Sequence, residues 1–227
     1  MPFHVLYDDS AITVCEKPIG LSSEAIEGEE SVMSLLAGYY AEKNEACTHY
    51  LLHRLDRGVG GLMVFAKTKA AAARLSEDIA AHRFEKCYLA VCSGDLATTV
   101  GKEGELCDLL FKDSRKNKVF TVSRKRQGVK EARLRFSLVK TATLEDEIFS
   151  LVFVTLITGR THQVRVQFAS RGHSLYGDGK YGSRKKGEIA LFSARISFVH
   201  PVTKKPMTFS LPMPDREPFL RFKEGTV

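Results

Sequence analysis

Residues 53–67 read His53-Arg54-Leu55-Asp56-Arg57-Gly58-Val59-Gly60-Gly61-Leu62-Met63-Val64-Phe65-Ala66-Lys67. This stretch joins a polar segment and a run of glycines to an apolar segment, 62–67, which predicts a buried strand. Glycines permit backbone geometry that other residues forbid, and loops positioned by strands often carry chemistry. Asp56 lies between two arginines, which favour the ionised carboxylate that a nucleophile or a general base requires. Taken alone, these residues support a reactive site and a structural Asp–Arg ion pair about equally.

Strand-like segments outnumber helical segments in the rest of the chain. Alternating or Val/Ile/Phe/Tyr-rich stretches predict strands over 11–17, 62–67, 84–93, 130–139, 148–156 and 189–200. Helices are predicted over 31–42, 69–81 and 161–171. Because strands and helices interleave irregularly, the fold class is α+β with a mixed sheet, and no linker or repeat divides residues 1–227, which predicts a single domain. The proline-rich tail after Pro201 is expected to run extended over the surface.

Composition excludes several classes of protein. A chain of 227 residues that is 44% hydrophobic and 27% charged is typical of a globular domain. No stretch is long and apolar enough to predict a membrane span, and the N-terminus has no secretion signal. The five cysteines contain no C-x-x-C pair, which favours reduced thiols in the cytoplasm over disulfides or a zinc ribbon.

The net charge of +7 is unevenly distributed. Residues 111–140 contain eleven Lys or Arg against two acids, and residues 160–186 contain seven against Asp178 alone. By contrast, residues 1–50 contain nine acids and two lysines. Basic clusters of this kind favour a polyanionic partner over a merely solvated face, although they do not distinguish RNA from DNA or from a membrane surface.

A second polar cluster follows the predicted strand 148–156. It reads Thr158-Gly159-Arg160-Thr161-His162-Gln163-Val164-Arg165. Backbone amides at the start of a helix, together with two arginines, would form an anion site. The alternative is an ordinary strand-to-helix turn capped by Thr161, which leaves the density of Arg, His and Gln unexplained.

Several other motifs do not indicate a functional site. Residues 177–182 match G-x-G-x-x-G, but they lack a clear preceding strand, a following helix and an acidic residue about 20 positions further on, so a dinucleotide site is not indicated. His49 and His53 have helical spacing without the glutamate of H-E-x-x-H, and neither a P-C-x-x-C nor a Walker motif occurs. We therefore predict no metal site and no cofactor.

The two polar clusters, in this order, resemble the hallmark of the RluA-type family of RNA pseudouridine synthases. That family pairs an H-R-L-D segment with a later G-R-T/S-H-Q-I/V-R segment. The resemblance extends along the chain through the segments Val5-Leu6-Tyr7-Asp8-Asp9, Glu16-Lys17-Pro18-Ile19-Gly20, Lys86-Cys87-Tyr88-Leu89-Ala90-Val91, Gly172-His173, Gly177-Asp178, Tyr181-Gly182 and Phe198-Val199-His200-Pro201. One departure is Val59-Gly60-Gly61, where family members often have Thr-Ser-Gly.

The resemblance assigns roles to individual residues. It makes Asp56 the catalytic aspartate, Tyr88 the tyrosine that stacks on the target base, and Arg165 the partner that keeps the aspartate ionised and oriented. Arg54 would enter the space left by the flipped nucleotide. Four further residues are assigned to phosphate binding or loop support: Arg57, Arg160, His162 and Gln163.

The resemblance also implies the architecture and the partners. It implies a pseudouridine synthase fold, with a mostly antiparallel sheet, flanking helices and a central active-site cleft. Its substrate would be structured ribosomal or transfer RNA, with no cofactor, no membrane and no obligate protein partner, and we expect a monomer. Because the family motifs begin at Val5, we expect no N-terminal S4-type domain. A non-catalytic RNA-binding protein and a metal-dependent nuclease are the alternatives.

Overall fold

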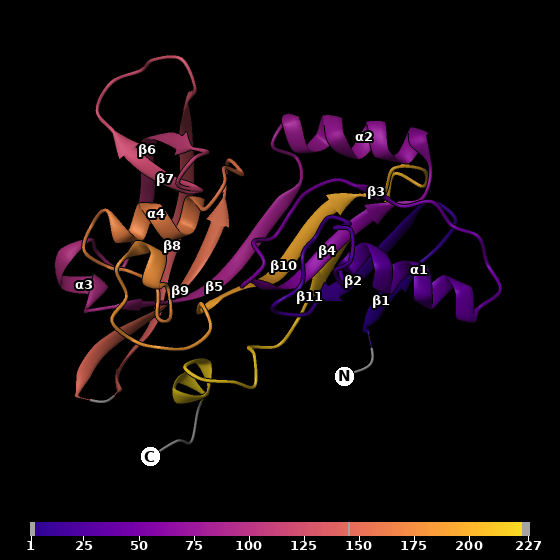
Figure 1. Cartoon of the computed structure of the whole chain (residues 1–227). Coiled ribbons are helices and arrows are strands. Elements are labelled where there is room, and N and C mark those ends of the chain that lie inside the picture. Colours follow the sequence, from indigo (N-terminus) through magenta and orange to yellow (C-terminus); the bar gives the residue numbers. More distant parts are fainter. Residues whose placement is uncertain (1–2, 145, 224–227) are drawn as a thin grey trace. The chain divides into compact units, whose positions relative to one another are not determined.

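The computed structural model describes residues 3–144 and 146–223. Their contacts group into two compact units. Unit 1 comprises Met1–Lys86 and Ser193–Leu211, and unit 2 comprises Cys87–Phe192 and Pro212–Val227. Strands β5 (Glu85–Ser93) and β10 (Leu191–Val199) contribute residues to both units (Figure 1). In the described part of the chain, no helix is both long and apolar enough to cross a membrane.

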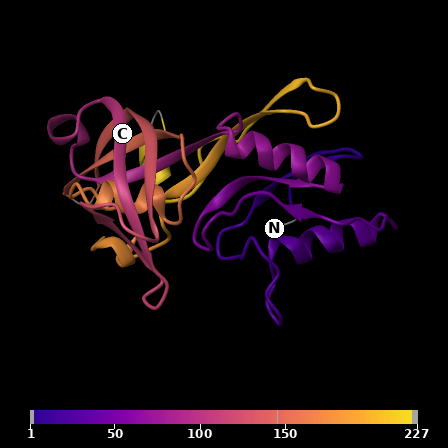
Figure 2. The same ribbon diagram turned by 90° about the horizontal axis from the view of Figure 1, so that it is seen from above.

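Unit 1 is a small sheet with a helix on each face. Its strands follow the order β1 (Val5–Asp8), β2 (Ile12–Lys17), β4 (Gly60–Ala66) and β10; in addition, β3 (Tyr50–Leu51) pairs with β4 and β11 (Pro206–Ser210) pairs with β10. Helices α1 (Val32–Glu42) and α2 (Lys69–Ala80) lie on opposite sides of these strands (Figure 2). The helices begin at Ser31 and Thr68, whose side chains accept hydrogen bonds from the first turn.

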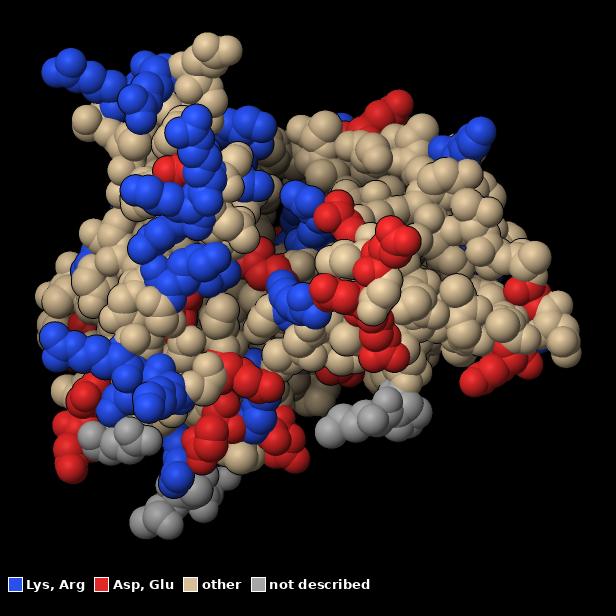
Figure 3. Space-filling model, in the orientation of Figure 1, with Lys and Arg blue, Asp and Glu red and all other residues tan. Residues whose placement is uncertain are grey.

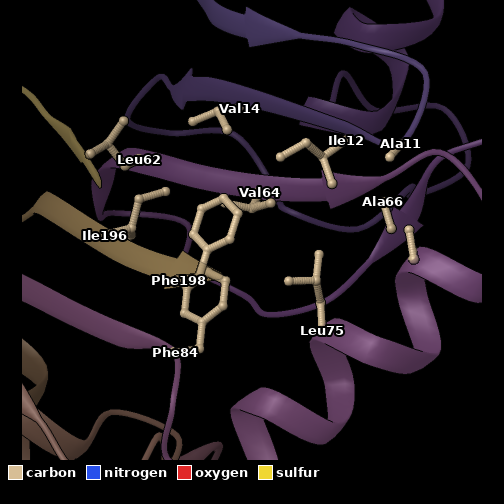
Figure 4. Close-up of a cluster of buried hydrophobic side chains, with 11 residues drawn as sticks. Ala11, Ile12, Val14, Leu62, Val64, Ala66, Leu75, Phe84, Ile196 and Phe198 are labelled. Carbon is tan, nitrogen blue, oxygen red and sulfur yellow. The ribbon is translucent and has the colours of Figure 1, made fainter. Parts of the chain in front are cut away.

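Alternation along β2 explains the two covered faces. Ile12 and Val14 point to the α2 side and join a buried cluster with Val64 and Leu75 (Figure 4). Thr13 points to the opposite side, where its Oγ1 lies 2.7 Å from the hydroxyl oxygen of Tyr40 in α1. Both faces of this sheet are therefore buried, and the sheet can hold a loop at its edge in a fixed position.

Unit 2 is a longer, mostly antiparallel sheet with short helices. Its strands follow the order β5, β9 (Glu147–Leu156), β8 (Val129–Leu144), β6 (Glu103–Asp113) and β7 (Lys118–Val122). The helices are α3 (Leu96–Thr99) and α4 (Gln163–Ala169), with 3-10 turns η1 (Gly179–Tyr181) and η2 (Phe219–Phe222). Val166 of α4 packs on a buried cluster with Leu110, Val119 and Ala132.

The α+β class with a mostly antiparallel sheet is confirmed, and so is a strand or helix at every predicted place. Three details differ. The predicted helix 161–171 is shorter, because His162 adopts a left-handed conformation (φ 51°) immediately before α4. The tail does not simply run extended, since it adds β11 to the sheet and buries Phe219 and Phe222 in η2. Strands β1, β3, β6 and β7 and the short helix α3 were not predicted.

Candidate active site

The loop before β4, residues 53–59, is held in place at three points within unit 1. The first is His53, whose buried imidazole accepts a hydrogen bond at Nε2 from the backbone N–H of Val64, at 3.2 Å. Burial, with a smaller contribution from the nearby Lys86 charge, lowers the pKa of His53 to about 3. The ring is therefore neutral at ordinary pH and remains an acceptor that ties the loop to β4.

The second point is Ser23, a buried side chain on the segment that follows β2. Its Oγ donates to the carbonyl oxygen of Leu55 at 2.9 Å and accepts from the N–H of Leu55 at 3.0 Å. Both backbone polar groups of the residue directly before Asp56 are thus satisfied by one hydroxyl. This fixes the backbone that carries Asp56.

The third point is Lys17, at the end of β2. Its Nζ donates to the backbone oxygens of Pro18 at 2.9 Å, Arg57 at 3.2 Å and Val59 at 2.8 Å. The residue is only 1% exposed. Burial lowers the pKa of Lys17 to about 8, and attraction to the Asp56 carboxylate partly offsets this effect. The lysine therefore binds the loop backbone on the C-terminal side of Asp56 and also brings a positive charge towards its carboxylate.

We expect Lys17→Met to destabilise the protein by about 3 kcal/mol, because buried carbonyl oxygens that lose their donor cost about 1–3 kcal/mol each. Arg57 keeps a second donor, the N–H of Gly20 at 2.8 Å, so the oxygens of Pro18 and Val59 carry most of the loss. Thermal and urea unfolding measure the effect. The exposed Lys69→Met in α2 serves as control and should stay within about 0.5 kcal/mol of wild type. Equal stability of the two variants would contradict the role of Lys17.

Asp56 itself is half-buried in a turn closed by a 2.9 Å hydrogen bond from the N–H of Val59 to its backbone oxygen. The arginines on either side make ion pairs with the acidic loop before α1. Nη1 of Arg54 lies 3.0 and 3.1 Å from the two carboxylate oxygens of Glu24. Nη2 of Arg57 lies 2.6 Å from Glu29. The guanidinium groups that were expected to contact RNA thus also contact exposed glutamates.

The remaining predicted site residues lie in unit 2. Tyr88 is buried on β5, and Arg165 is buried in α4. The guanidinium of Arg165 makes a two-point ion pair with Asp178, from Nε at 2.6 Å and from Nη2 at 2.8 Å. Its Cζ lies 5.2 Å from the ring centre of Tyr181, whose hydroxyl lies 2.9 Å from Nδ1 of His162. Arg165 is thereby held on two sides inside unit 2.

The segment before α4 is held by internal hydrogen bonds, and the anion site predicted at this helix start stays a prediction. Oε1 of Gln163 already accepts from the N–H of Arg160 at 3.0 Å and from the hydroxyl of Thr158 at 2.8 Å. Nε of Arg160 donates to the backbone oxygen of Glu131 at 2.9 Å. The alternative, a cap by Thr161, is wrong, since the residue before α4 is His162, which makes no side-chain cap.

Comparison with known proteins identifies the fold and the family. The model of the RNA pseudouridylate synthase family matches residues 11–170. The chain belongs to the RluA-type family of RNA pseudouridine synthases. It is 32% identical over 214 residues to an uncharacterized RNA pseudouridine synthase, YhcT, of Bacillus subtilis, covering 92% of this chain and 68% of that protein. Ribosomal large subunit pseudouridine synthase D of Zymomonas mobilis is 30% identical over 234 residues, covering 94% and 70%.

A solved structure agrees on the fold. Human RNA Pseudouridylate Synthase Domain Containing 1 superimposes with a TM-score of 0.76 at 19% identity, over 92% of this chain and 83% of that chain. The chain is therefore an isomerase with a pseudouridine synthase fold, which acts on RNA.

The glycines after Asp56 explain how this synthase departs from the Thr-Ser-Gly common in its family. At Gly61 (φ 113°), a Cβ atom would lie 2.3 Å from the backbone oxygen of Ser193, so this position accepts only glycine. At Gly60, a Cβ atom would lie 2.9 Å from Cγ1 of Ile19. The space for a serine side chain at position 60 is thus occupied by Ile19.

Sequence reasoning missed three residues that hold the synthase's loop and its arginine. Lys17 was noted only as part of a family segment, Asp178 only there and as an isolated acid in a basic region, and Ser23 was not noted. A signal existed for Asp178, because it is the only acid among residues 160–186. Lys17 ends a strand whose other members are mostly apolar, which is also unusual. Nothing in the sequence distinguishes Ser23 from other serines.

Proposed function

We propose that this synthase converts uridine to pseudouridine in ribosomal RNA, with transfer RNA as the second candidate, and that Asp56 carries the chemistry. The observation that carries the proposal is the fixed loop around Asp56, bound at Leu55 by Ser23 and at Arg57 and Val59 by Lys17. The choice of ribosomal RNA rests on relatives whose names specify the ribosomal large subunit. We further propose a cytoplasmic monomer.

In the reaction, the N1–C1′ bond of the target uridine breaks, the uracil rotates, and C5 bonds to C1′ while the C5 hydrogen leaves as a proton. Asp56 either attacks C1′ directly or removes a sugar proton to start an elimination. Both routes require a carboxylate, and the Lys17 ammonium is close enough to the Asp56 carboxylate to interact with it electrostatically. A backbone fixed on both sides of Asp56 keeps the carboxylate at one position relative to the sugar, which lowers the entropic cost of the reaction.

We propose that Tyr88 and Arg165 act in the same reaction. The target nucleotide has to leave its stack, at a cost of roughly a few kcal/mol, and a tyrosine ring offers a flat face to the displaced base. Arg165 would orient the Asp56 carboxylate, and its two-point pair with Asp178 leaves its guanidinium little rotational freedom. Arg54 would enter the space left by the flipped nucleotide. Arg57, Arg160, His162 and Gln163 would bind phosphates or support the loops.

The direct test is release of tritium from RNA labelled at C5 of uridine. The RNA is drawn from cells that lack this protein, so that its target sites are unmodified. We expect release by the wild-type protein with EDTA present and no cofactor added. Position-by-position mapping of the product then distinguishes ribosomal from transfer RNA. No release from either RNA, despite binding, would favour a non-catalytic RNA-binding protein and overturn the proposal.

The glutamates before α1 should weaken RNA binding. The Arg54–Glu24 and Arg57–Glu29 pairs are exposed, so each contributes no more than about 1 kcal/mol and an RNA phosphate can displace it. We expect the double variant Glu24→Gln, Glu29→Gln to bind RNA about three- to tenfold more tightly at low salt, with a steeper salt dependence. Filter binding over a range of salt concentrations measures both.

The matched control is Glu42→Gln, Glu45→Gln, which changes the net charge equally at exposed positions of the same unit that make no ion pair with Arg54 or Arg57. For this control we expect RNA affinity to change by about twofold or less, because only the overall electrostatic potential of the protein changes. If both double variants bind RNA equally, the glutamates do not compete with phosphate for these arginines.

A further inference from the structure

The hairpin of β6 and β7 keeps an aromatic ring in solvent. Phe120 is 36% exposed, and it is the only aromatic residue among the large hydrophobic side chains that are exposed in the described chain. Burying a phenylalanine side chain is favourable by about 1.5–3 kcal/mol. An exposed phenylalanine on a regular strand therefore indicates a surface that a binding partner covers.

Phe120 belongs to a small apolar surface on one face of the hairpin. It lies directly opposite Phe111 across the strand pair, and the next pair on the same face is Val122 with Leu109. These three neighbours are half-buried. The opposite face of the hairpin carries Leu110 and Val119, which pack in the buried cluster under α4. The exposed face is therefore backed by a fixed strand pair.

Cations flank this surface on the hairpin, while the exposed Glu131 of β8 lies opposite Leu109 at its other edge. Residues 112–126 contain seven Lys or Arg and a single acid, Asp113, whose carboxylate accepts from the N–H groups of the hairpin turn. Cζ of Arg126 lies 4.8 Å from the ring centre of Phe111. Nζ of Lys118 lies 5.8 Å from that of Phe120 and 5.3 Å from that of Tyr181. Lys and Arg side chains gather over the part of unit 2 that carries β6 and β7 (Figure 3).

We propose that this aromatic surface, made by Phe120 and Phe111, binds an unpaired base of the RNA substrate by stacking, while Lys118 and Arg126 contact the neighbouring phosphates. An apolar partner protein would have to cover the cations, whereas an unpaired nucleotide brings a flat apolar face and a negative charge together. A duplex offers the phosphates but keeps its base faces stacked inside. The surface thus selects RNA that has unpaired loops or ends. This inference rests on the proposed function in one respect, namely that the substrate is RNA.

Tryptophan fluorescence tests the stacking directly, because the chain contains no tryptophan. In Phe120→Trp, the single indole replaces the exposed ring. We expect an unpaired oligonucleotide to quench its fluorescence strongly, and a blunt duplex at the same phosphate concentration to leave it nearly unchanged. Val202→Trp, at a 65% exposed position of unit 1, is the control and should respond to neither RNA. Absent quenching, or equal quenching by the duplex, overturns the proposal.

A second measurement distinguishes stacking on the aromatic ring from simple burial of apolar surface. Stacking on an aromatic side chain changes affinity by about 5- to 150-fold, so we expect Phe120→Leu to raise KM for the labelled RNA about tenfold. Phe120→Tyr restores the flat face and should return KM to within about twofold of wild type. Equal KM values for the leucine variant and wild type would reject the surface.

The two proposals fail separately. Tritium release by wild type without quenching of Phe120→Trp rejects the stacking surface and leaves the synthase activity in place. Quenching by unpaired RNA without tritium release supports the stacking surface and rejects the synthase activity, since the protein then binds RNA without modifying it.

Discussion

Asp56→Asn should reduce tritium release from C5-labelled RNA by about a thousandfold or more, the range seen when an essential nucleophile or base is removed. Asparagine has the shape of aspartate but can neither attack C1′ nor accept a sugar proton. The contacts of Ser23 and Lys17 with the loop go to backbone atoms, so the loop itself should persist. We therefore expect RNA affinity to stay within about threefold and the melting temperature within a few degrees.

The control for this variant is Asp215→Asn, which removes a carboxylate that is 83% exposed in unit 2. Its tritium release should match wild type within about twofold, as is usual for surface substitutions. Equal release by wild type and Asp56→Asn would leave the enzyme class in place and overturn Asp56 as the catalytic residue. Parallel loss of RNA binding and activity would point to a structural role.

Asp178→Asn should have the largest effect on stability. The side chains of Arg165 and Asp178 are only 6% and 1% exposed, and removing one partner of a buried ion pair costs about 3–5 kcal/mol. For a protein of this size, such a loss lowers the melting temperature by about 10 °C. Because the guanidinium of Arg165 also loses its fixed orientation, we expect tritium release below the new melting temperature to fall at least about tenfold.

A neighbouring ion pair provides the comparison. Asp108 accepts from Arg171 at 2.9 Å, but its side chain is 18% exposed and that of Arg171 is 27% exposed. Asp108→Asn should therefore cost about 1–2 kcal/mol, with little change in tritium release. If Asp178→Asn behaves like Asp108→Asn in both measurements, Arg165 does not depend on Asp178 for its position.

The sequence predicted those parts of the fold whose side chains follow a simple pattern. In β2, Ile12 and Val14 alternate with Thr13 and Cys15, whereas β4 is apolar on both faces, and both predicted strand positions agree with the structure to within two residues. β6 was missed because Asp108 occupies an inward position between Leu106 and Leu110, which breaks the apolar pattern. Its carboxylate is tolerated there only because Arg171 and Gln167, about sixty positions later, bind it.

The candidate site likewise has one part that the sequence predicted and one part that it did not. Asp56 and its arginines form a local motif that a reader of the sequence can find. The groups that fix its backbone come from elsewhere: Ser23 is 32 positions from Leu55, and Lys17 is 42 positions from Val59. Such long-range hydrogen bonds leave no periodic signal, because a serine or a lysine satisfies a distant carbonyl only once the sheet of unit 1 has formed. The two compact units of the described chain were likewise not evident from a sequence without a linker.

The contact between Ile19 and Gly60 has a consequence for how this loop can evolve. Because a Cβ atom at position 60 would lie 2.9 Å from Cγ1 of Ile19, the two positions share one volume, which the backbone oxygen of Lys17 also limits at 3.2 Å from that Cβ atom. A chain can fill that volume with a large residue at 19 and glycine at 60, or with a small residue at 19 and serine at 60. The two positions are therefore coupled: serine at position 60 is disfavoured beside Ile19, and relatives with serine at position 60 should carry a smaller side chain at position 19.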